Sequence, residues 1–246
     1  MASGSFDLLA AEYDRNWTNS GPGRSQRNAV WREMIPLFRP GDTVLDLGCG
    51  TGEDAECLGL FDISVRALDA SPEMVRMARA RGVNAEVGKI EEIRTFDITF
   101  DGVISNFGPL NCVEDIRTLR TSLAQIVRPG GFLVLCLMSR FCLMESLHYF
   151  CRRQWRKAVR RWMGLTYAET LGVNVFYPSG QALKRALSPE FRLVRRIGIG
   201  LTVPPSYMTG LSPASLEMRD RFDECFAHWP VLRSMADHQL FVFVRK

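Results

Sequence analysis

Short apolar runs alternate, along the first half of the chain, with segments whose apolar residues recur every three or four positions. The short runs predict buried strands, and the longer period predicts helices with one apolar face. Strands are predicted over residues 43–47, 63–68, 84–87, 99–105 and 132–137, and helices over 6–16, 25–38, 53–60, 72–81 and 115–127. Alternation of this kind predicts a parallel sheet with helices on both faces, the doubly wound α/β class.

The last third of the chain has a different pattern. A long helical stretch is predicted over 139–164, an extended segment over 172–177, and helices over 181–187 and 212–228. Two further strands are predicted over 192–199 and 240–245, the second almost wholly apolar. A chain of 246 residues is long enough to bury one large core, so we expect a single domain.

Residues 44–52, Val-Leu-Asp-Leu-Gly-Cys-Gly-Thr-Gly, join a predicted strand to a predicted helix. Glycine at alternate positions lets the backbone turn sharply and lets a ligand approach closely. Such strand-to-helix turns are where open α/β sheets bind nucleotides. The spacing is GxGxG, not the GxGxxG of dinucleotide folds. Because Asp46 lies beside the loop, we expect a cationic ligand rather than a pyrophosphate.

A second acidic residue follows the next predicted strand. Asp69 lies 23 residues after Asp46, close to the roughly 20-residue spacing of an acid that binds ribose hydroxyls. Ser71 and Pro72 fit the N-cap and the first turn of the following helix. A plain capping role for Asp69 is the alternative, and its distance from the glycine loop favours ribose.

The segments VLDLGCGTG and ALDASPEM resemble the first two motifs of the class I S-adenosylmethionine (SAM)-dependent methyltransferases. The resemblance covers roughly residues 40–140 and is only topological beyond them. It implies a Rossmann-like, mostly parallel seven-stranded sheet whose last strand is antiparallel, with an added helical cap. We accordingly expect N-terminal lid helices in 1–40, a cofactor-binding core in 41–138, cap insertions in 139–189 and 201–237, and SAM as the cofactor.

The resemblance also implies which residues contact the cofactor. Asp46 and the glycine loop would face its methionine part, Asp69 the ribose, and Ala70 and Met74 the adenine. In the lid, Arg27 is favoured over Arg24 as the partner of the SAM carboxylate. The predicted set is Tyr13, Arg27, Asp46, Gly48, Cys49, Gly50, Gly52, Asp69, Ala70, Met74, Ile90, Glu91, Asn106 and Phe107.

One position departs from the family pattern. The family often has an acid after the glycine at 88, and this chain has Lys89 there. Ile90 is then expected to pack on the adenine ring, and Glu91 to accept from its amino group. Asn106, at the end of the fourth predicted strand, is expected to bring its backbone carbonyl near the methionine amine.

The acceptor site is less defined. Methylases of bases or amides typically carry Asn/Asp-Pro-Pro-Tyr/Phe after the fourth strand, and this chain has Asn-Phe-Gly-Pro, which argues against those substrates. Asn111 and Phe141, together with Phe107, are predicted to contact a small apolar acceptor through oxygen, nitrogen or carbon. No catalytic residue is identified; the candidates for a base are His148 and His238. Adjacent strand residues point to opposite faces, so we do not expect Asp237 to pair with His238.

A second class of function rests on the basic residues of 152–161. Six of these ten residues are Arg or Lys, and they account for more than the net charge of +4 of the whole chain. If residues 143–163 form one amphipathic helix, its Trp and Leu face predicts peripheral membrane contact. A solvated outer face is the simpler interpretation. Nucleic-acid binding is not expected, since the basic charge is confined to one helix.

Composition limits the remaining choices. The seven cysteines form no CxxC pair, so a zinc site or a disulfide framework is not predicted, and we expect no metal. Neither a secretion signal nor a membrane span is apparent, and we expect a cytoplasmic location. The sequence does not define the oligomeric state.

Overall fold

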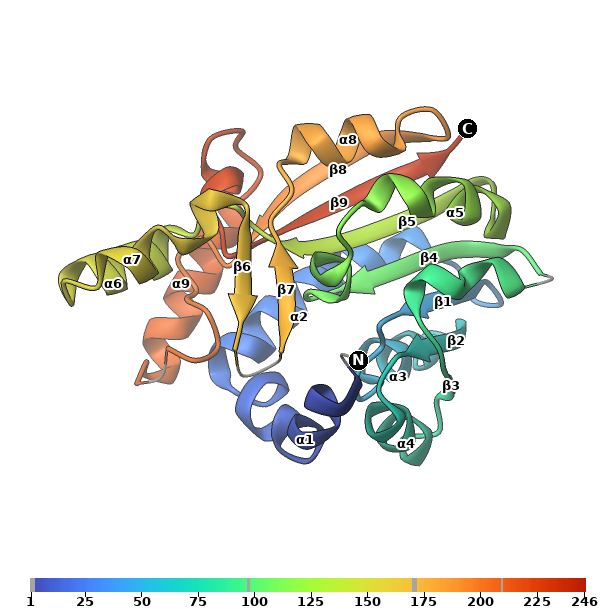
Figure 1. Cartoon of the computed structure of the whole chain (residues 1–246), viewed down its shortest axis with the longest axis horizontal. Helices are drawn as coiled ribbons and strands as arrows, with labels where there is room; N and C mark the ends of the chain where they lie inside the picture. The colour runs from blue at the N-terminus through green and yellow to red at the C-terminus, as the bar shows by residue number, and fades with distance from the viewer. Residues whose placement is uncertain (1–2, 97, 170–171, 209) are drawn as a thin grey trace.

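A seven-stranded sheet forms the centre of the computed structural model, which describes residues 3–96, 98–169, 172–208 and 210–246 (Figure 1). Its strand order is β3-β2-β1-β4-β5-β9-β8. The pairs from β3 to β5 are parallel, and β9 is antiparallel to both neighbours. The strands are β1 (Thr43–Leu47), β2 (Ser64–Asp69), β3 (Asn84–Val87), β4 (Phe100–Asn106), β5 (Val127–Met138), β8 (Phe191–Ile199) and β9 (His238–Arg245). The predicted α/β fold with one antiparallel strand is confirmed.

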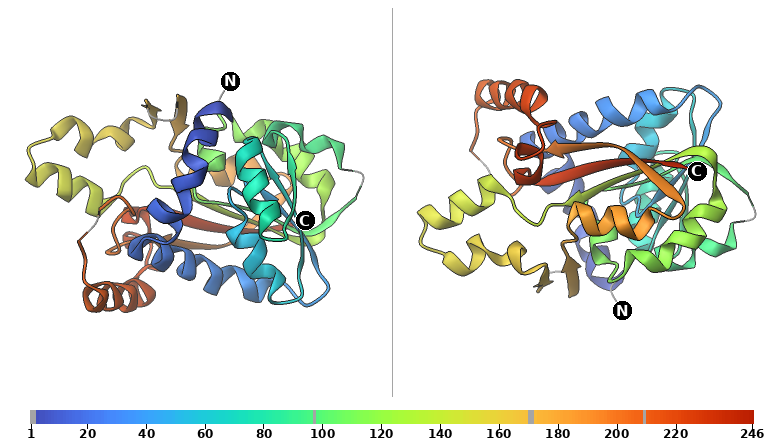
Figure 2. Two further views of the ribbon diagram at one scale, coloured as in Figure 1. Left: turned by 90° about the horizontal axis from the view of Figure 1, so that it is seen from below. Right: turned by 90° about the horizontal axis from the view of Figure 1, so that it is seen from above.

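Helices cover both faces of this sheet, as the two views of Figure 2 show. One face packs against α2 (Gly21–Met34), α3 (Glu53–Gly59) and the region following α9 (Pro213–Phe226). The other packs against α5 (Arg120–Ile126) and α8 (Gly180–Leu187). α1 (Ser3–Tyr13) lies against α4 (Pro72–Ala80), beyond the carboxyl ends of the parallel strands. Consecutive residues of the central strands therefore face two separate apolar cores.

The N-terminal helices differ from the prediction in their bounds. α1 ends at Tyr13 and is continued by a short π-helix, η1 (Asp14–Thr18). α2 begins four residues earlier than predicted, since Ser20 caps it by accepting from the Gly23 amide at 3.1 Å. Pro22 then occupies the first turn, where its missing N–H costs nothing. The predicted separator at residues 21–23 is thus the start of the helix.

The single helix predicted over 139–164, and with it the amphipathic helix 143–163, is wrong. The structure has three short pieces, α6 (Leu143–Cys151), α7 (Trp155–Ala158) and η6 (Arg160–Met163). Arg153 breaks the first from the second with a left-handed φ of 58°. The chain folds back because Glu145 on α6 forms ion pairs with Arg160 and Arg161 on η6. A helix of 21 residues would hold these groups far apart.

The segments predicted as cap insertions do not all lie over the carboxyl end of the sheet. After α7, a two-stranded antiparallel sheet of β6 (Leu165–Ala168) and β7 (Val173–Phe176) crosses in front of the main sheet (Figure 1). α8, in contrast, packs on the main sheet through buried Leu183 and Leu187. α9 lies beside α2. Among the described residues, no helix has the length and apolar character needed to cross a bilayer.

Candidate cofactor and acceptor site

The glycine loop after β1 is tied to the end of β2 by hydrogen bonds from its amides. Gly48, Gly50 and Gly52 all have positive φ, at 75°, 54° and 87°. The amides of Gly48 and Cys49 donate to the carbonyl of Leu68 at 2.7 and 3.1 Å. The Gly50 amide donates to Oδ2 of Asp69 at 2.9 Å. These amides are therefore engaged within the protein, which explains why a loop of this spacing does not suit a pyrophosphate.

Gly48 is expected to tolerate no side chain. A Cβ built there lies 2.3 Å from the Pro109 side chain, and the left-handed backbone itself costs an L-residue about 1–2 kcal/mol. Gly48→Ala should therefore lower the free energy of unfolding by more than that backbone cost, as measured by urea denaturation. Gly82→Ala is the matched control, since Gly82 has φ 85° and nothing within 4 Å of its Cβ. Equal losses for the two variants would contradict this account.

Asp46 is the least compensated charge in this region. It is 1% exposed, and its Oδ2 has no hydrogen-bond partner in the described structure. Burial, followed by repulsion from Asp54, raises its pKa well above the ordinary value, against the opposing attraction of Arg27. A buried carboxylate without a partner is unfavourable. A cation placed beside it would remove that cost.

Asp54, which was not among the predicted site residues, accepts hydrogen bonds from three neighbouring side chains. Its Oδ1 accepts from Arg27 Nη1 at 2.6 Å and from Trp31 Nε1 at 2.7 Å. Its Oδ2 accepts from Asn106 Nδ2 at 3.0 Å. The clue in the sequence was an acid in the first turn of the helix after the loop. The predicted site residues Arg27, Asn106 and Asp46 are thus brought together around a residue that was missed.

The charges of this group favour a cationic ligand. Burial raises the pKa of Asp46, the carboxylates of Asp54 and Asp69 raise it further, and Arg27 is the cation that opposes them. Burial raises the pKa of Asp69 too, although the amides of Ser71 and Gly50 oppose the shift. The positive sulfur and the amine of SAM fit this surplus of carboxylates, so the residues present suit the cofactor implied by the sequence.

The N-terminal segment covers the loop. Asp14 of η1 accepts from Thr51 Oγ1 at 2.6 Å and from Arg81 Nη2 at 2.5 Å. Asp7 of α1 accepts from Ser71 Oγ and from the Glu73 amide, at the start of α4. These bonds hold α1 and η1 over the cofactor region, where a lid was predicted.

The other predicted cofactor residues take varied positions in this region. Burial raises the pKa of Tyr13 to about 12, with Arg27 opposing the shift and Asp69 adding to it, so its ring lies within this charged group. Met74 is 2% exposed under the lid, whereas Ala70 and Glu91 are exposed. Ile90 is half-buried and packs on the core at the start of a short 3₁₀ turn. The adenine contacts stay a prediction.

Phe107 links the cofactor region to the acceptor side. It has a φ of 61°, a conformation that is strained for an aromatic residue. Its ring centroid lies 4.8 Å from Trp17 and 5.3 Å from His238, and the Arg27 guanidinium lies 4.9 Å from it. The lid, the cofactor side and the start of β9 therefore meet at one side chain.

Two of the predicted acceptor-side residues have other tasks in the structure. The Asn111 side chain is buried and bonds to the backbone, donating to Phe176 O at 2.6 Å and accepting from the Met138 amide at 2.9 Å. It ties β5 to β7 and has little left for a ligand. Phe141 packs its ring on Trp162 at 5.5 Å, at the base of α6. His148 lies on α6 beside Tyr149.

His238 is placed differently from the expectation. Its Nδ1 lies 3.3 Å from Oδ2 of Asp237, so the two side chains are close, against the prediction. The alternation rule fails because β9 begins at His238, leaving Asp237 outside the strand. Burial alone would raise the pKa of Asp237, but His238 and Arg161 hold it below its ordinary value.

Arg161 lies inside the protein between two carboxylates. It pairs with Asp237 at 2.9 Å and also with Glu145, and all three side chains are buried. Cys142, Glu145 and Asp237 place their ligand atoms close enough together to hold a metal ion. The guanidinium of Arg161 already supplies the positive charge for both carboxylates. The prediction of no metal site therefore stands as a prediction.

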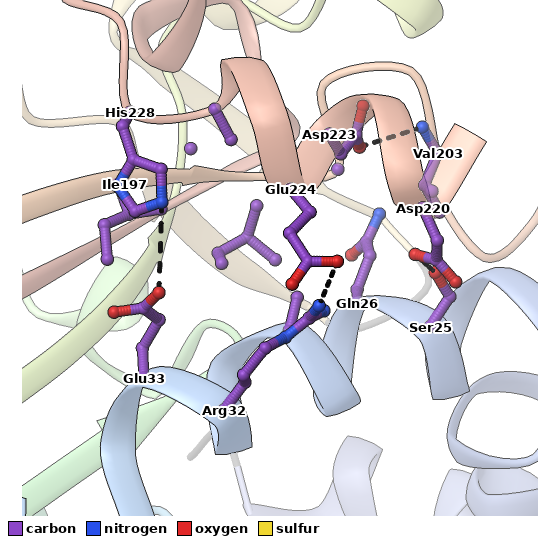
Figure 3. A pocket seen from close by; sticks show the side chains of 15 residues that line it. Ser25, Gln26, Arg32, Glu33, Ile197, Val203, Asp220, Asp223, Glu224 and His228 are labelled. Carbon is purple, nitrogen blue, oxygen red and sulfur yellow. Dashed lines mark hydrogen bonds and ion pairs between the residues drawn. The ribbon is translucent and has the colours of Figure 1, made fainter. Parts of the chain in front are cut away.

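A separate cavity of about 130 Å³ lies between α2, α9 and β8 (Figure 3). Its charged side chains pair across it: Arg32 with Glu224 at 2.8 Å, and His228 with Glu33 at 4.0 Å. Asp223 accepts from the Val203 amide at 3.2 Å. Apart from its shared position on α2, the cavity has no residue of the predicted cofactor set. It is the packing seam between two helices.

Comparison with known proteins agrees with this geometry. Residues 44–131 match the model of the methyltransferase domain family. The chain is 29% identical over 154 residues to a ubiquinone biosynthesis O-methyltransferase of Xanthomonas oryzae pv. oryzae, covering 56% of this chain and 64% of the relative. It is 33% identical over 137 residues to a demethylmenaquinone methyltransferase of Mycobacterium sp., covering 54% and 58%. The matches thus span less than two thirds of these relatives.

Solved structures extend the similarity of fold over nearly the whole chain. A SAM-dependent methyltransferase from Mesorhizobium loti superposes with a TM-score of 0.63 at 21% identity, covering 90% of this chain and 98% of that one. A Haloferax volcanii chain solved in complex with the Trm112 methyltransferase activator gives 0.62 at 21% identity, covering 97% and 96%. At these identities the comparison concerns the fold.

Proposed function

We propose that this chain, which belongs to the class I SAM-dependent methyltransferase family, transfers a methyl group from SAM to a small apolar molecule. The observation that carries the proposal is the buried, unpartnered Oδ2 of Asp46 beside a glycine loop whose amides at Gly48, Cys49 and Gly50 donate within the protein. This arrangement supports a ligand with positive charge and room for close backbone approach.

SAM, when bound, supplies a methyl group on a positive sulfur that leaves as a neutral thioether once the acceptor takes the methyl. The chain has to align the two reactants, and alignment alone supplies a large part of such a rate enhancement. Asp46 and Asp54 would balance the positive charge of the cofactor. Arg27, whose guanidinium lies 4.8 Å from the Trp17 ring and 4.9 Å from the Phe107 ring, would offer the carboxylate its Nε, which has no hydrogen-bond partner in the described structure.

The proposal of an apolar aromatic acceptor rests on two supports. Aromatic rings meet where the cofactor region adjoins β9, with Phe107 against Trp17 and His238. The two relatives described above carry names from ubiquinone and menaquinone biosynthesis, so a quinone-like ring is a reasonable class. One name specifies an O-methyltransferase and the other does not, which leaves the accepting atom open.

Between the two candidate bases, the geometry favours His238. It is buried next to the ionised Asp237, and its ring contacts Phe107. His148 lies on α6 and has no carboxylate partner among the described ion pairs. A base matters when the acceptor has a proton to lose, as a hydroxyl does.

A calorimetric titration tests the cofactor assignment. The parent protein should bind SAM, and Asp69→Ala should bind it roughly tenfold to a hundredfold more weakly, because a charge-assisted hydrogen bond is worth about 1.5–3 kcal/mol. Glu114→Ala removes an exposed acid elsewhere and should change nothing. Methyl transfer from labelled SAM to dihydroxylated benzenes and short-chain quinols then tests the acceptor class. A parent protein that fails to bind SAM would refute the proposal.

A further inference from the structure

The segment from α6 to η6 (residues 143–163), which we call the arm, is packed with its polar side inward. Glu145 and Ser146 are buried, at 2% and 5% exposure. Glu145 receives Arg160 and Arg161, and Ser146 Oγ donates to the carbonyl of Ala158 at 3.0 Å. Because these polar groups take the inner side, the apolar ones remain outside.

The outer side of the arm presents large apolar side chains to solvent. Leu147 is 49% exposed, Trp155 58%, Trp162 41% and Met163 78%. Leu165 and Tyr167 on β6 continue this surface at 48% and 59%. Single exposed apolar residues are ordinary, but six of them within 21 consecutive residues indicate a surface that another body covers.

The exposed charge of the arm is of one sign. From residue 146 to residue 168 the sequence contains no Asp or Glu. Arg160 and Arg161 are balanced by Glu145 and Asp237. Arg152, Arg153, Arg156 and Lys157 are exposed and join no ion pair within the described part of the chain. Four unbalanced positive charges therefore lie around the Trp155 side chain.

The arm also projects from the body of the protein. Figures 1 and 2 show α6 and α7 side by side as a hairpin that extends well beyond the sheet. Its turn, at Arg153, has a left-handed backbone. The free basic residues lie at this turn and along α7, which is the part of the arm farthest from the sheet.

We propose that the arm binds the surface of an anionic lipid bilayer, with its basic residues on the headgroups and Trp155 at the interface. Basic side chains combined with exposed Trp and Leu are the composition of interfacial membrane anchors. A second copy of the chain would bring like charges together. Nucleic-acid bases could stack on Trp155 but offer no apolar counterpart for the exposed Leu147 and Met163. If the proposed function holds, the acceptor is one that partitions into lipid and reaches the site from the bilayer.

Vesicle flotation tests the proposal without SAM or an acceptor. The parent protein should float with equimolar phosphatidylglycerol and phosphatidylcholine vesicles at low salt, and stay behind with phosphatidylcholine alone. Each basic residue at such a surface is worth about 1 kcal/mol. The fourfold variant Arg152→Gln, Arg153→Gln, Arg156→Gln and Lys157→Gln should then bind about a thousandfold more weakly.

A control variant separates local from net charge. Arg39→Gln, Lys184→Gln, Arg185→Gln and Arg192→Gln remove four exposed charges outside the arm and should leave vesicle binding nearly intact. Trp155→Ala should reduce binding about tenfold with the charge unchanged. The SAM affinity of all three variants, measured by calorimetry, should equal that of the parent. A loss of vesicle binding can then be distinguished from a loss of cofactor binding.

Four results would overturn the proposal. The parent protein would fail to float with anionic vesicles, or the two fourfold variants would lose binding equally. Sedimentation would alternatively show a dimer that Trp155→Ala dissociates, which would assign the arm to a second copy. Tight binding of a mixed-sequence RNA, abolished by the arm variant, would assign it to nucleic acid.

Discussion

Asp46→Asn is expected to weaken SAM binding by tenfold to more than a hundredfold while making the free protein more stable. The carboxylate is buried without a partner on one oxygen, so it is a cost to the free protein and a benefit to a cationic ligand. A lost charge-assisted hydrogen bond accounts for about 1.5–3 kcal/mol of binding. The neutral amide of Asn removes both the cost of burying a charge and the attraction to the cationic ligand. Such an exchange of stability for binding is common at functional sites.

The free energy of unfolding and the SAM affinity are expected to change with pH in opposite directions. Because the folded pKa of Asp46 is raised above its unfolded value, the folded state binds the proton more tightly. Its contribution to stability is thus full below the unfolded pKa and is lost as the pH rises through the folded pKa. SAM binding favours the ionised form, so affinity should increase over that same rise, with release of a proton.

Calorimetry and thermal unfolding across pH measure both trends. In Asp46→Asn both trends should be flatter, and its advantage in unfolding temperature should grow as the pH rises. Asp62→Asn is the matched control, since Asp62 is exposed and its positive φ of 58° suits Asn. An Asp46→Asn variant that binds SAM like the parent would remove Asp46 from the site.

Arg161→Met is expected to lower the free energy of unfolding more than any other single substitution proposed here. It takes the buried cation away from both Glu145 and Asp237, leaving Glu145 with only Arg160 and Asp237 with only His238 as ion-pair partners, and breaking one partner of a buried ion pair costs about 3–5 kcal/mol. For a chain of this length each 1 kcal/mol shifts the unfolding temperature by about 2–4 °C, so a shift on the order of 10 °C should be observed. Differential scanning calorimetry measures it directly.

Two comparisons make this result specific. Arg221→Met breaks an exposed pair with Glu217 and should cost less than about 1 kcal/mol. Combining Arg161→Met with Glu145→Gln and Asp237→Asn removes the charges of both carboxylates and should recover much of the loss. No recovery in the triple variant would mean that Arg161 stabilises the protein by packing and not by charge.

The parts of the fold that the sequence predicted are those set by local pattern. The β1 run, the three glycines and the N-cap Ser71 each depend on a few neighbouring residues, and the structure has them in place. The parallel sheet with helices on both faces followed from the alternation of strands and helices, whereas the antiparallel last strand was implied by the family resemblance.

The failures have tertiary causes. A continuous helix over 143–163 satisfied every local rule, but the pairing of Glu145 with Arg160 and Arg161 favours a fold-back at Arg153. Asp54 was missed because its partners Arg27 and Asn106 are 27 and 52 residues away in the chain. The closeness of Asp237 and His238 depended on the residue at which β9 begins, and strand ends are the least predictable feature.

The amides of the glycine loop have a consequence for competition among metabolites. A cell contains abundant nucleotides that share the adenosine portion of SAM but carry phosphates. Because the Gly48, Cys49 and Gly50 amides donate to Leu68 and Asp69, a phosphate would meet the Asp46 and Asp69 carboxylates there without these three donors. We therefore expect charge to discriminate against ATP and the dinucleotides at this loop. Selectivity of this kind needs no bulky side chain to exclude the wrong ligand, and it weakens as salt screens the field.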